Sequence, residues 1–224
     1  MKKKIIVAID GPASSGKSTT AKLLAKKLHC IYVDSGAMYR AVALYLLNHN
    51  INFDNKENLK KIVHQINIEI KPGHSSDENI IILNGEDVSK KIREPKITKY
   101  SSTFATDGII RKRMVELQRK MAETRSIVMD GRDIGTVVFP DADYKFFLNA
   151  SLDKRAKRRW LEDKARGHER KSFEQIKNEL AFRDKTDSTR EIAPLRKADD
   201  AIEIDTTNLS IQDQVDLIYN IIKK

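Results

Sequence analysis

The stretch IIVAIDGPASSGKSTT, residues 5–20, decides the fold of this chain. An apolar, strand-forming run leads into Gly11-x4-Gly16-Lys17-Ser18, which is the spacing of a phosphate-binding loop. Glycines let backbone N–H groups turn inward around an anion, Lys17 is a point charge for terminal phosphates, and the Ser18 hydroxyl suits Mg²⁺. Residues 19–28 predict a helix whose positive N-terminal end faces the same anion. The stretch therefore predicts binding of a nucleoside triphosphate.

Outside this loop, apolar strands alternate with helical patterns, which predicts an α/β fold with a mainly parallel sheet covered on both faces. The expected strands are 4–9, 31–33, 126–129, 144–148 and 201–204, and the expected helices are 19–28, 37–47, 56–65, 95–105, 109–123, 152–166, 172–186 and 211–222. Residues 66–83 instead alternate around turn-forming residues at 72–76, and Asn84-Gly85 follows, so this region predicts antiparallel hairpins. We interpret residues 56–103 as an insertion in the parallel core.

Composition narrows the class of protein without deciding it. The 224 residues suit one α/β core with a small insertion, and the net charge of +10 suits nucleic acid, an anionic membrane or a polyanionic substrate. A single cysteine, Cys30, excludes an internal disulfide and favours a reducing, cytoplasmic location. No apolar run approaches the ~20 residues of a membrane span, and the start does not resemble a signal peptide. We therefore expect no membrane partner.

Three classes of phosphate-loop protein compete. A GTP-dependent switch needs Asn/Thr-Lys-x-Asp after a strand, and the partial matches at 55–58 and 98–101 lack the aspartate. A nucleic-acid-stimulated ATPase fits the charge, but aromatic residues for base stacking are sparse. A small-molecule kinase is favoured by arginines beside turns and strand ends, because phosphoryl transfer spreads negative charge over equatorial oxygens. Arg132 is the strongest case, since it follows a strand at the edge where open α/β sheets bind ligands.

Five longer motifs resemble the bacterial cytidylate kinases, nucleoside monophosphate kinases of the phosphate-loop class. They are residues 10–12 (DGP), 34–40 (DSGAMYR), 84–93 (NGEDVSKKIR), 130–140 (DGRDIGTVVFP) and the pattern RD-x2-D-x2-R-x2-APL at 183–195. The resemblance covers nearly the whole chain. It implies a phosphate-loop kinase fold with a parallel five-stranded central sheet flanked by helices, an inserted monophosphate-binding domain with a small antiparallel sheet, and a helical lid. The implied domains are a core at 1–55 and 104–224, the insertion at 56–103 and the lid at 154–170.

The resemblance also implies the reaction, phosphoryl transfer from ATP with Mg²⁺ to CMP or dCMP, and the residues on the ATP side. The ATP phosphates would be held by the loop residues Gly11, Pro12, Ala13, Ser14, Ser15, Gly16, Lys17, Ser18 and Thr19, with Ser18 as the metal ligand. Of the basic lid, Arg155, Arg158 and Arg159 would lie nearest ATP. Thr206 belongs to the loop that would lie beside adenine.

On the CMP side, the resemblance assigns residues to each part of the substrate. The CMP phosphate would be bound by Ser35, Arg40 and Arg132, the cytosine by Ser102, Arg111 and Asp133, the sugar by Arg183 and Asp187, and a phosphate by Arg190. Its catalytic residues would be Lys17, Arg132, Arg158 and Arg190. A carboxylate can accept a hydrogen bond from the N4 amine of cytosine, whereas uracil offers an oxygen there, so Asp133 suits discrimination against UMP. From the residues alone, Ser102 and Arg111 also fit plain roles, a local backbone bond and a solvated helix face.

The expected partners are therefore the small molecules CMP or dCMP and ATP, with no nucleic acid and no membrane, and we expect a monomer. A kinase of the same fold that acts on UMP or AMP remains the second possibility.

Overall fold

The computed structural model describes residues 4–51, 55–72, 79–165, 167 and 171–224. The chain divides into two compact units, residues 1–31 with 126–224 and residues 32–125. The predicted insertion, 56–103, lies within the second unit, which extends beyond it on both sides.

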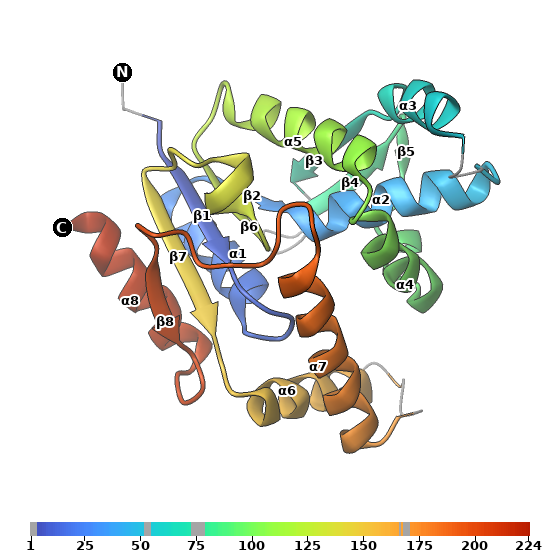
Figure 1. The fold of residues 1–224 in the computed structure, drawn as a ribbon. Coiled ribbons are helices and arrows are strands. Elements are labelled where there is room, and N and C mark those ends of the chain that lie inside the picture. Colours follow the sequence, from blue (N-terminus) through green and yellow to red (C-terminus); the bar gives the residue numbers. More distant parts are fainter. Residues whose placement is uncertain (1–3, 52–54, 73–78, 166, 168–170) are drawn as a thin grey trace. The chain divides into compact units, whose positions relative to one another are not determined.

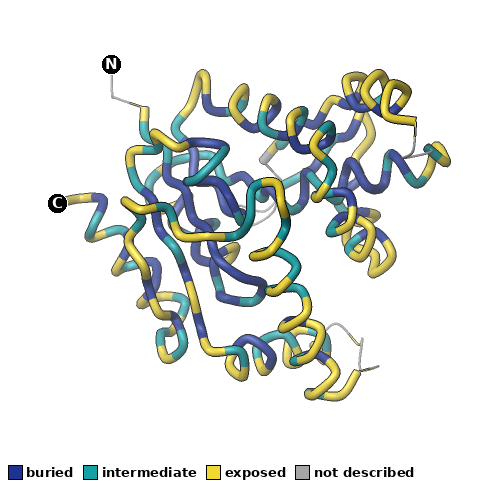
Figure 2. The backbone as a smooth tube through the Cα atoms, in the orientation of Figure 1, coloured by how far each residue is buried: buried dark blue, intermediate teal, exposed yellow. Residues whose placement is uncertain are grey.

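The central sheet has five strands in the order β2-β6-β1-β7-β8. They are β1 (Ile6–Asp10), β2 (Ile31–Asp34), β6 (Ile127–Gly131), β7 (Tyr144–Asn149) and β8 (Ile202–Asp205), and the chain passes from the first unit to the second within β2. β1 runs parallel to both β6 and β7, and β7 runs parallel to β8 (Figure 1). Every residue of β6 is buried, as in a strand covered on both faces, and β6 is dark blue in Figure 2. The prediction of a parallel five-stranded sheet is confirmed.

The first unit has four helices: α1 (Lys17–Leu28), α6 (Leu152–Ala165), α7 (Phe173–Thr189) and α8 (Ile211–Lys223). α1 packs against α8 and β6, while α6 packs against α7. Ala13 of the phosphate loop shares an apolar cluster with Ala156 of α6 and with Ile176 and Leu180 of α7. Packing between the loop and the pair α6–α7 therefore depends on apolar contacts as well as on charge.

The second unit holds the helices α2 (Ser35–Asn48), α3 (Lys56–His64), α4 (Pro95–Phe104) and α5 (Gly108–Ala122), with the 3₁₀ turn η1 (Lys91–Arg93). Its three-stranded antiparallel sheet joins β3 (Ile68–Pro72), β4 (Asn79–Leu83) and β5 (Glu86–Asp87). Asn84 and Gly85, both at positive φ, make the tight turn between β4 and β5, so the predicted antiparallel hairpin is confirmed. The predicted turn at 72–76 lies largely outside the described residues.

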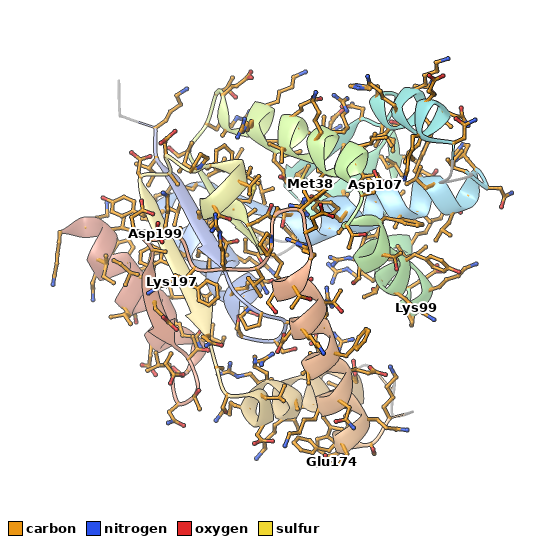
Figure 3. All side chains as sticks on the ribbon, in the orientation of Figure 1. Met38, Lys99, Asp107, Glu174, Lys197 and Asp199 are labelled. Carbon is orange, nitrogen blue, oxygen red and sulfur yellow. The ribbon has the colours of Figure 1, made fainter. Side chains whose placement is uncertain are left out.

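Helices on both sides of the predicted insertion belong to this second unit. α2 packs against α4, η1 and β4, and α3 packs against α5. Asp107, labelled in Figure 3, begins α5 by accepting hydrogen bonds from the amides of Ile109 and Ile110, and it pairs with Lys56 of α3. These contacts between segments distant in sequence explain why the compact unit is wider than the insertion that local patterning indicated.

Candidate active site

The phosphate-binding loop connects β1 to α1 in the first unit, and its backbone requires glycine at two positions. Gly11 and Gly16 have φ angles of 152° and 94°, in the region that side chains disfavour. A Cβ atom on Gly11 would lie 2.1 Å from the carbonyl oxygen of Leu148, and one on Gly16 would lie 2.9 Å from Oε1 of Gln214. The loop thus passes too close to β7 and α8 for any larger residue.

Lys17, the first residue of α1, is buried to 5% exposure, and its Nζ donates to the carbonyl of Pro12 at 3.0 Å. The amino group is therefore held against the loop that the sequence predicts to surround the phosphates. A buried ammonium is costly unless it meets acceptors, which fits a binding role better than a surface one.

Ser18 Oγ donates to Asp130 Oδ2 at 2.6 Å, joining the loop to the carboxyl end of β6. Across the described residues, His, Cys, Asp and Glu form no group of three or more that could hold a metal ion alone. Mg²⁺ prefers one or two protein oxygens together with nucleotide phosphates, so this pair of hard oxygen donors fits it. The sequence interpretation missed Asp130, although an aspartate ending an apolar strand beside the loop strand was the available signal.

The arginines of α6 differ sharply in their surroundings. Arg155 is buried and donates to the carbonyls of Ala150 at 2.9 Å and Ala13 at 3.3 Å, and its Nη2 lies 2.7 Å from Asp184 of α7. Arg155 therefore ties α6 to the loop and to α7 through protein groups. Arg159 pairs with Glu162 and Asp163 on its own helix instead.

Arg158 and Thr206 form a second connection to the loop. Arg158 donates to the Ser15 carbonyl at 3.2 Å and to the Thr206 carbonyl at 2.5 Å, and Thr206 Oγ1 donates to the Ser15 carbonyl at 2.7 Å. Thr206 is fully buried after β8. The described part of the predicted lid, 154–165 with 167, is thus fastened to the phosphate loop at its N-terminal half, while 166 and 168–170 lie outside the described residues.

Replacing Arg158 by alanine should lower kcat roughly tenfold to 150-fold, because charge-assisted hydrogen bonds contribute about 1.5–3 kcal/mol each and this side chain bonds the loop backbone. Arg159→Ala on the same helix is the matched control and should change kcat little. Steady-state kinetics with ATP and an acceptor would measure both, with KM for the acceptor nearly unchanged. Equal effects of the two substitutions would show that the contacts of Arg158 with the loop do not matter for turnover.

A cluster of arginines and aspartates follows β6 and the end of α7. Arg132 Nε donates to Asp187 Oδ2 at 2.8 Å, and Arg183 and Arg190 each approach Asp187 to 4.0 Å. Arg190 Nη2 also lies 3.8 Å from Asp133 Oδ1. Burial favours the protonated form of Asp187, but Arg132 and then the other two arginines outweigh it, so its pKa lies below the ordinary value.

This cluster brings five predicted acceptor residues together within one unit. Three guanidinium groups surround two carboxylates, which leaves one positive charge in excess for an anionic group. Because Arg132 is oriented through its Nε by Asp187, its planar fork is pre-organised, and arginine can then bind a phosphate through two parallel hydrogen bonds.

The second unit contains the other predicted acceptor residues. Asp34 caps α2 through the amide of Ala37 and pairs with Arg40 at 3.0 Å, while Ser35 begins α2 and is buried. Ser102 lies half-buried in α4.

Arg111 is only 4% exposed, whereas its neighbour Lys112 is exposed, so the interpretation of Arg111 as part of a solvated helix face is wrong. Its Nη1 donates to the carbonyl of Ala105 at 3.0 Å, and its guanidinium lies 5.8 Å from the centre of the Tyr39 ring. A buried guanidinium beside an aromatic face is the kind of group that reads a flat, polar ligand.

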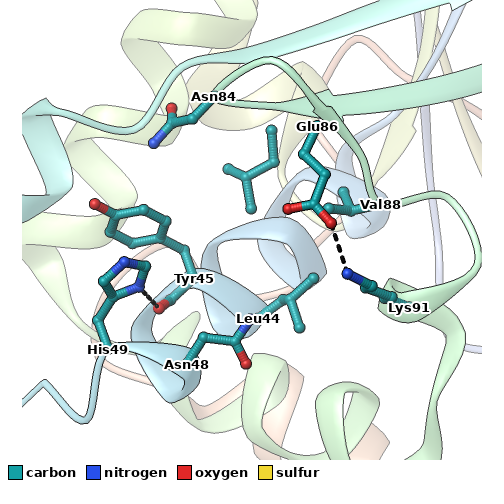
Figure 4. Close-up of a pocket in the computed structure, with 9 residues that line it drawn as sticks. Leu44, Tyr45, Asn48, His49, Asn84, Glu86, Val88 and Lys91 are labelled. Carbon is teal, nitrogen blue, oxygen red and sulfur yellow. Dashed lines mark hydrogen bonds and ion pairs between the residues drawn. The ribbon is translucent and has the colours of Figure 1, made fainter.

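A hollow of about 320 Å³ in the second unit is lined by none of the predicted site residues (Figure 4). It lies between the C-terminal half of α2 and the β4–β5 turn. In its wall, Glu86 pairs with Lys91 at 2.6 Å, and His49 Nδ1 lies 2.8 Å from the Tyr45 carbonyl. These polar groups bond to each other. Because no predicted site residue lines the hollow, we do not include it in the site described above.

The loop between β1 and α1, the paired Ser18 and Asp130 and the parallel sheet together define a phosphate-loop protein of the kinase fold. The family model for cytidylate kinase matches residues 7–224, and the chain therefore belongs to the cytidylate kinase family.

Individual relatives agree with this assignment. The chain is 47% identical to proteins named cytidylate kinase from Bacillus cereus (strain ATCC 10987 / NRS 248) and Bacillus thuringiensis (strain Al Hakam), over 99% of this chain and 97% of each relative. A solved shikimate kinase from Bacteroides thetaiotaomicron superposes with a TM-score of 0.51 at 12% identity, covering 98% of this chain and 99% of that one. At that identity the shikimate kinase supports the fold alone.

Of the helices in the described part of the chain, none is both long and apolar enough to cross a membrane.

Proposed function

We propose that the protein transfers the γ-phosphoryl group of ATP to CMP, and to dCMP, giving the nucleoside diphosphate and ADP. The observation that carries this proposal is the presence of two anion-binding groupings in one compact unit, the phosphate loop and the cluster of Arg132, Arg183 and Arg190. A kinase needs one grouping for the donor and one for the acceptor. Family membership then favours CMP as the acceptor.

On the donor side, the backbone N–H groups of residues 11–19, apart from Pro12, which has none, would bind the ATP phosphates, with Lys17 as the held positive charge. Mg²⁺, held through Ser18 and Asp130, would neutralise phosphate charge. Arg158 and Thr206 would keep the loop in its binding shape through the Ser15 carbonyl. Arg155 supports the same loop from within the protein, and we assign it a positioning role rather than a direct contact with ATP.

On the acceptor side, Arg132 and Arg190 would bind the CMP phosphate and stabilise the charge that develops during transfer. Asp133 would accept from the cytosine N4 amine, and Asp187, with Arg183, would meet the sugar. Ser35, Arg40, Ser102 and Arg111 of the second unit are proposed as acceptor-binding residues on the strength of the family motifs. Asp187 has a further task here, because it already orients Arg132.

The transfer itself needs no covalent enzyme intermediate. The CMP phosphate oxygen would attack the γ-phosphorus in line, while the arginines and Lys17 neutralise the equatorial oxygens. Closure of the segment 154–170 would exclude water from the reaction. We further propose that the enzyme acts as a monomer in the cytoplasm on these small molecules, without nucleic acid or a membrane. The single cysteine supports the cytoplasmic location, and the sparse aromatic residues support the absence of nucleic acid.

Substituting Asp130 by asparagine should raise the Mg²⁺ concentration needed for half-maximal activity about tenfold, since removing a partner of a metal site costs roughly 10–100-fold in affinity or activity. Asp143→Asn is the control. Asp143 is also a carboxylate, but it accepts a hydrogen bond from the amide of Ile6 on β1 and is not one of the proposed metal ligands. A magnesium titration of initial rates measures the change. If both variants respond to magnesium like the parent protein, Asp130 does not serve the metal.

The proposed reaction can be tested by product analysis. The protein is incubated with CMP, Mg²⁺ and ATP labelled in its γ-phosphate, and the nucleotides are separated. We expect label in CDP and an equal amount of ADP. Label released as inorganic phosphate, with none in CDP, would instead indicate an ATPase and would contradict the proposal.

A further inference from the structure

Asp10 is a buried carboxylate for which the reaction described above has no role. It is the last residue of β1, directly before Gly11, and is 5% exposed. Its Oδ1 accepts from the amide of Ile134 and its Oδ2 from the amide of Gly135, both at 2.8 Å. Each carboxylate oxygen thus holds one backbone N–H of a segment 124 or 125 positions away in sequence.

The segment that Asp10 holds is η2 (Ile134–Val138), a single π-helical turn. The Asp133 carbonyl accepts from the amides of Val137 and Val138, whereas the first amides of any helical turn lack an acceptor within the turn. The side chain of Asp133, which occupies the capping position, makes no capping hydrogen bond. Asp10 therefore supplies the cap that Asp133 would otherwise have provided, and Asp133 is directed elsewhere, toward Arg190.

The turn is also packed on its other side. A Cβ atom added to Gly135 would lie 3.3 Å from Cδ of Lys145 and 3.5 Å from Oδ2 of Asp10. Lys145 is itself fixed by Asp200 at 2.6 Å and by the carbonyl of Pro140. Gly135 is thus enclosed between the side chains of Asp10 and Lys145, so the backbone that follows Asp133 has little freedom to move.

We propose that Asp10 is a positioning residue that aims the carboxylate of Asp133 and thereby sets the choice of base in the acceptor. This inference rests on the proposed function, in which Asp133 reads cytosine. Asp10 is 5% exposed and each of its carboxylate oxygens already accepts from a backbone amide, so we assign it no direct contact with a substrate. It acts through two backbone amides immediately after Asp133, and rotation of those amides would redirect the Asp133 side chain.

The surroundings of Asp10 act on its pKa in opposite directions. Burial raises its pKa to about 7, the amides of Gly135 and Ile134 oppose that rise, and Asp133 raises the pKa further while Lys17 lowers it. A neutral residue would be easier to bury here. An amide of the same shape would not serve, because its NH₂ group would face a backbone N–H and leave one of the two amides without an acceptor.

The test compares Asp10→Asn with the parent protein and with the control Asp143→Asn, which also removes a carboxylate that accepts from a backbone amide. Steady-state kinetics give kcat/KM for CMP and UMP, and titration gives the dissociation constant for ATP. We expect Asp10→Asn to lower the CMP-to-UMP ratio of kcat/KM about tenfold, the effect of one misplaced hydrogen bond, with ATP affinity nearly unchanged. Asp143→Asn should leave both quantities as they are.

A double substitution separates positioning from general damage. If Asp10 acts through Asp133, then Asp10→Asn added to Asp133→Asn should change the ratio no further, because coupled sites are not additive. If Asp10→Asn fails to bind ATP, Gly135→Ala serves as a second variant, because its added Cβ atom would press against Lys145 on the other side of the same turn. It should also lower the CMP-to-UMP ratio of kcat/KM, by a smaller factor.

The outcomes separate this inference from the proposed function. An unchanged CMP-to-UMP ratio in Asp10→Asn, or a further fall of the ratio in the double variant, overturns the positioning role while CMP kinase activity of the parent protein stands. A parent protein that prefers another nucleotide overturns the proposed function itself. A parallel loss of ATP affinity and of activity with both acceptors would show that Asp10 only supports the fold.

Discussion

Replacing Lys17 by alanine should lower kcat by a factor of several hundred to several thousand. Lys17 is buried at the start of α1 and its Nζ lies 3.0 Å from the Pro12 carbonyl, inside the phosphate loop. Removing a pre-organised positive charge from the transition state should raise the barrier by about 3–5 kcal/mol, which corresponds to that loss of rate. Single-turnover and steady-state assays with ATP and CMP would measure it.

Lys26→Ala provides the matched control, because Lys26 belongs to the last turn of the same helix and is exposed. We expect it to leave kcat nearly unchanged, and the far-ultraviolet circular dichroism of both variants should match that of the parent protein. Near-normal turnover by Lys17→Ala would contradict the assignment of the loop to the transferred phosphate.

Replacing Asp133 by asparagine should lower kcat/KM for CMP about a hundredfold and narrow the difference between CMP and UMP. An unmatched buried polar group costs about 1–3 kcal/mol, and an asparagine amide would donate toward the position where cytosine also donates. The same amide could donate to O4 of uracil. Asp133 is buried beside Arg190, so little water is present to compensate for the mismatch.

Kinetics with CMP, dCMP and UMP in the parent protein and in Asp133→Asn measure this effect. Arg111→Ala is the companion variant, because a guanidinium can donate to O2 of both pyrimidines, whereas N3 accepts only in cytosine, so the substitution should weaken both and CMP more. If Asp133→Asn leaves the CMP-to-UMP ratio unchanged, Asp133 does not read the base, and its proximity to Arg190 would mean that it orients that arginine for phosphate.

The elements of the fold that depend on local pattern could be predicted from the sequence. The apolar run before Gly11 and the residue types of the loop identify β1, the loop and α1, and alternation around Asn84-Gly85 identifies the antiparallel sheet. Each of these signals is confined to a short window, in which periodicity and turn chemistry determine the local structure.

Features that depend on contacts between distant segments could not be predicted in this way. The pairing of Ser18 with Asp130 joins residues 112 positions apart, and the cap that Asp10 provides to η2 spans 124 positions. The sequence also gives no sign that Arg155 bonds Ala13 and Asp184 while Arg159 stays on its own helix, since both belong to one basic run. Burial of Arg111 likewise depends on how α5 packs within its unit.

The most direct test of CMP kinase activity is kcat/KM for CMP, dCMP, UMP and AMP, measured with ATP and Mg²⁺ under identical conditions. We predict that CMP and dCMP exceed UMP by roughly tenfold to a hundredfold or more, because cytosine offers its N4 amine to Asp133 at the position where uracil has an oxygen. Equal values for CMP and UMP, or a preference for AMP, would contradict the proposed function.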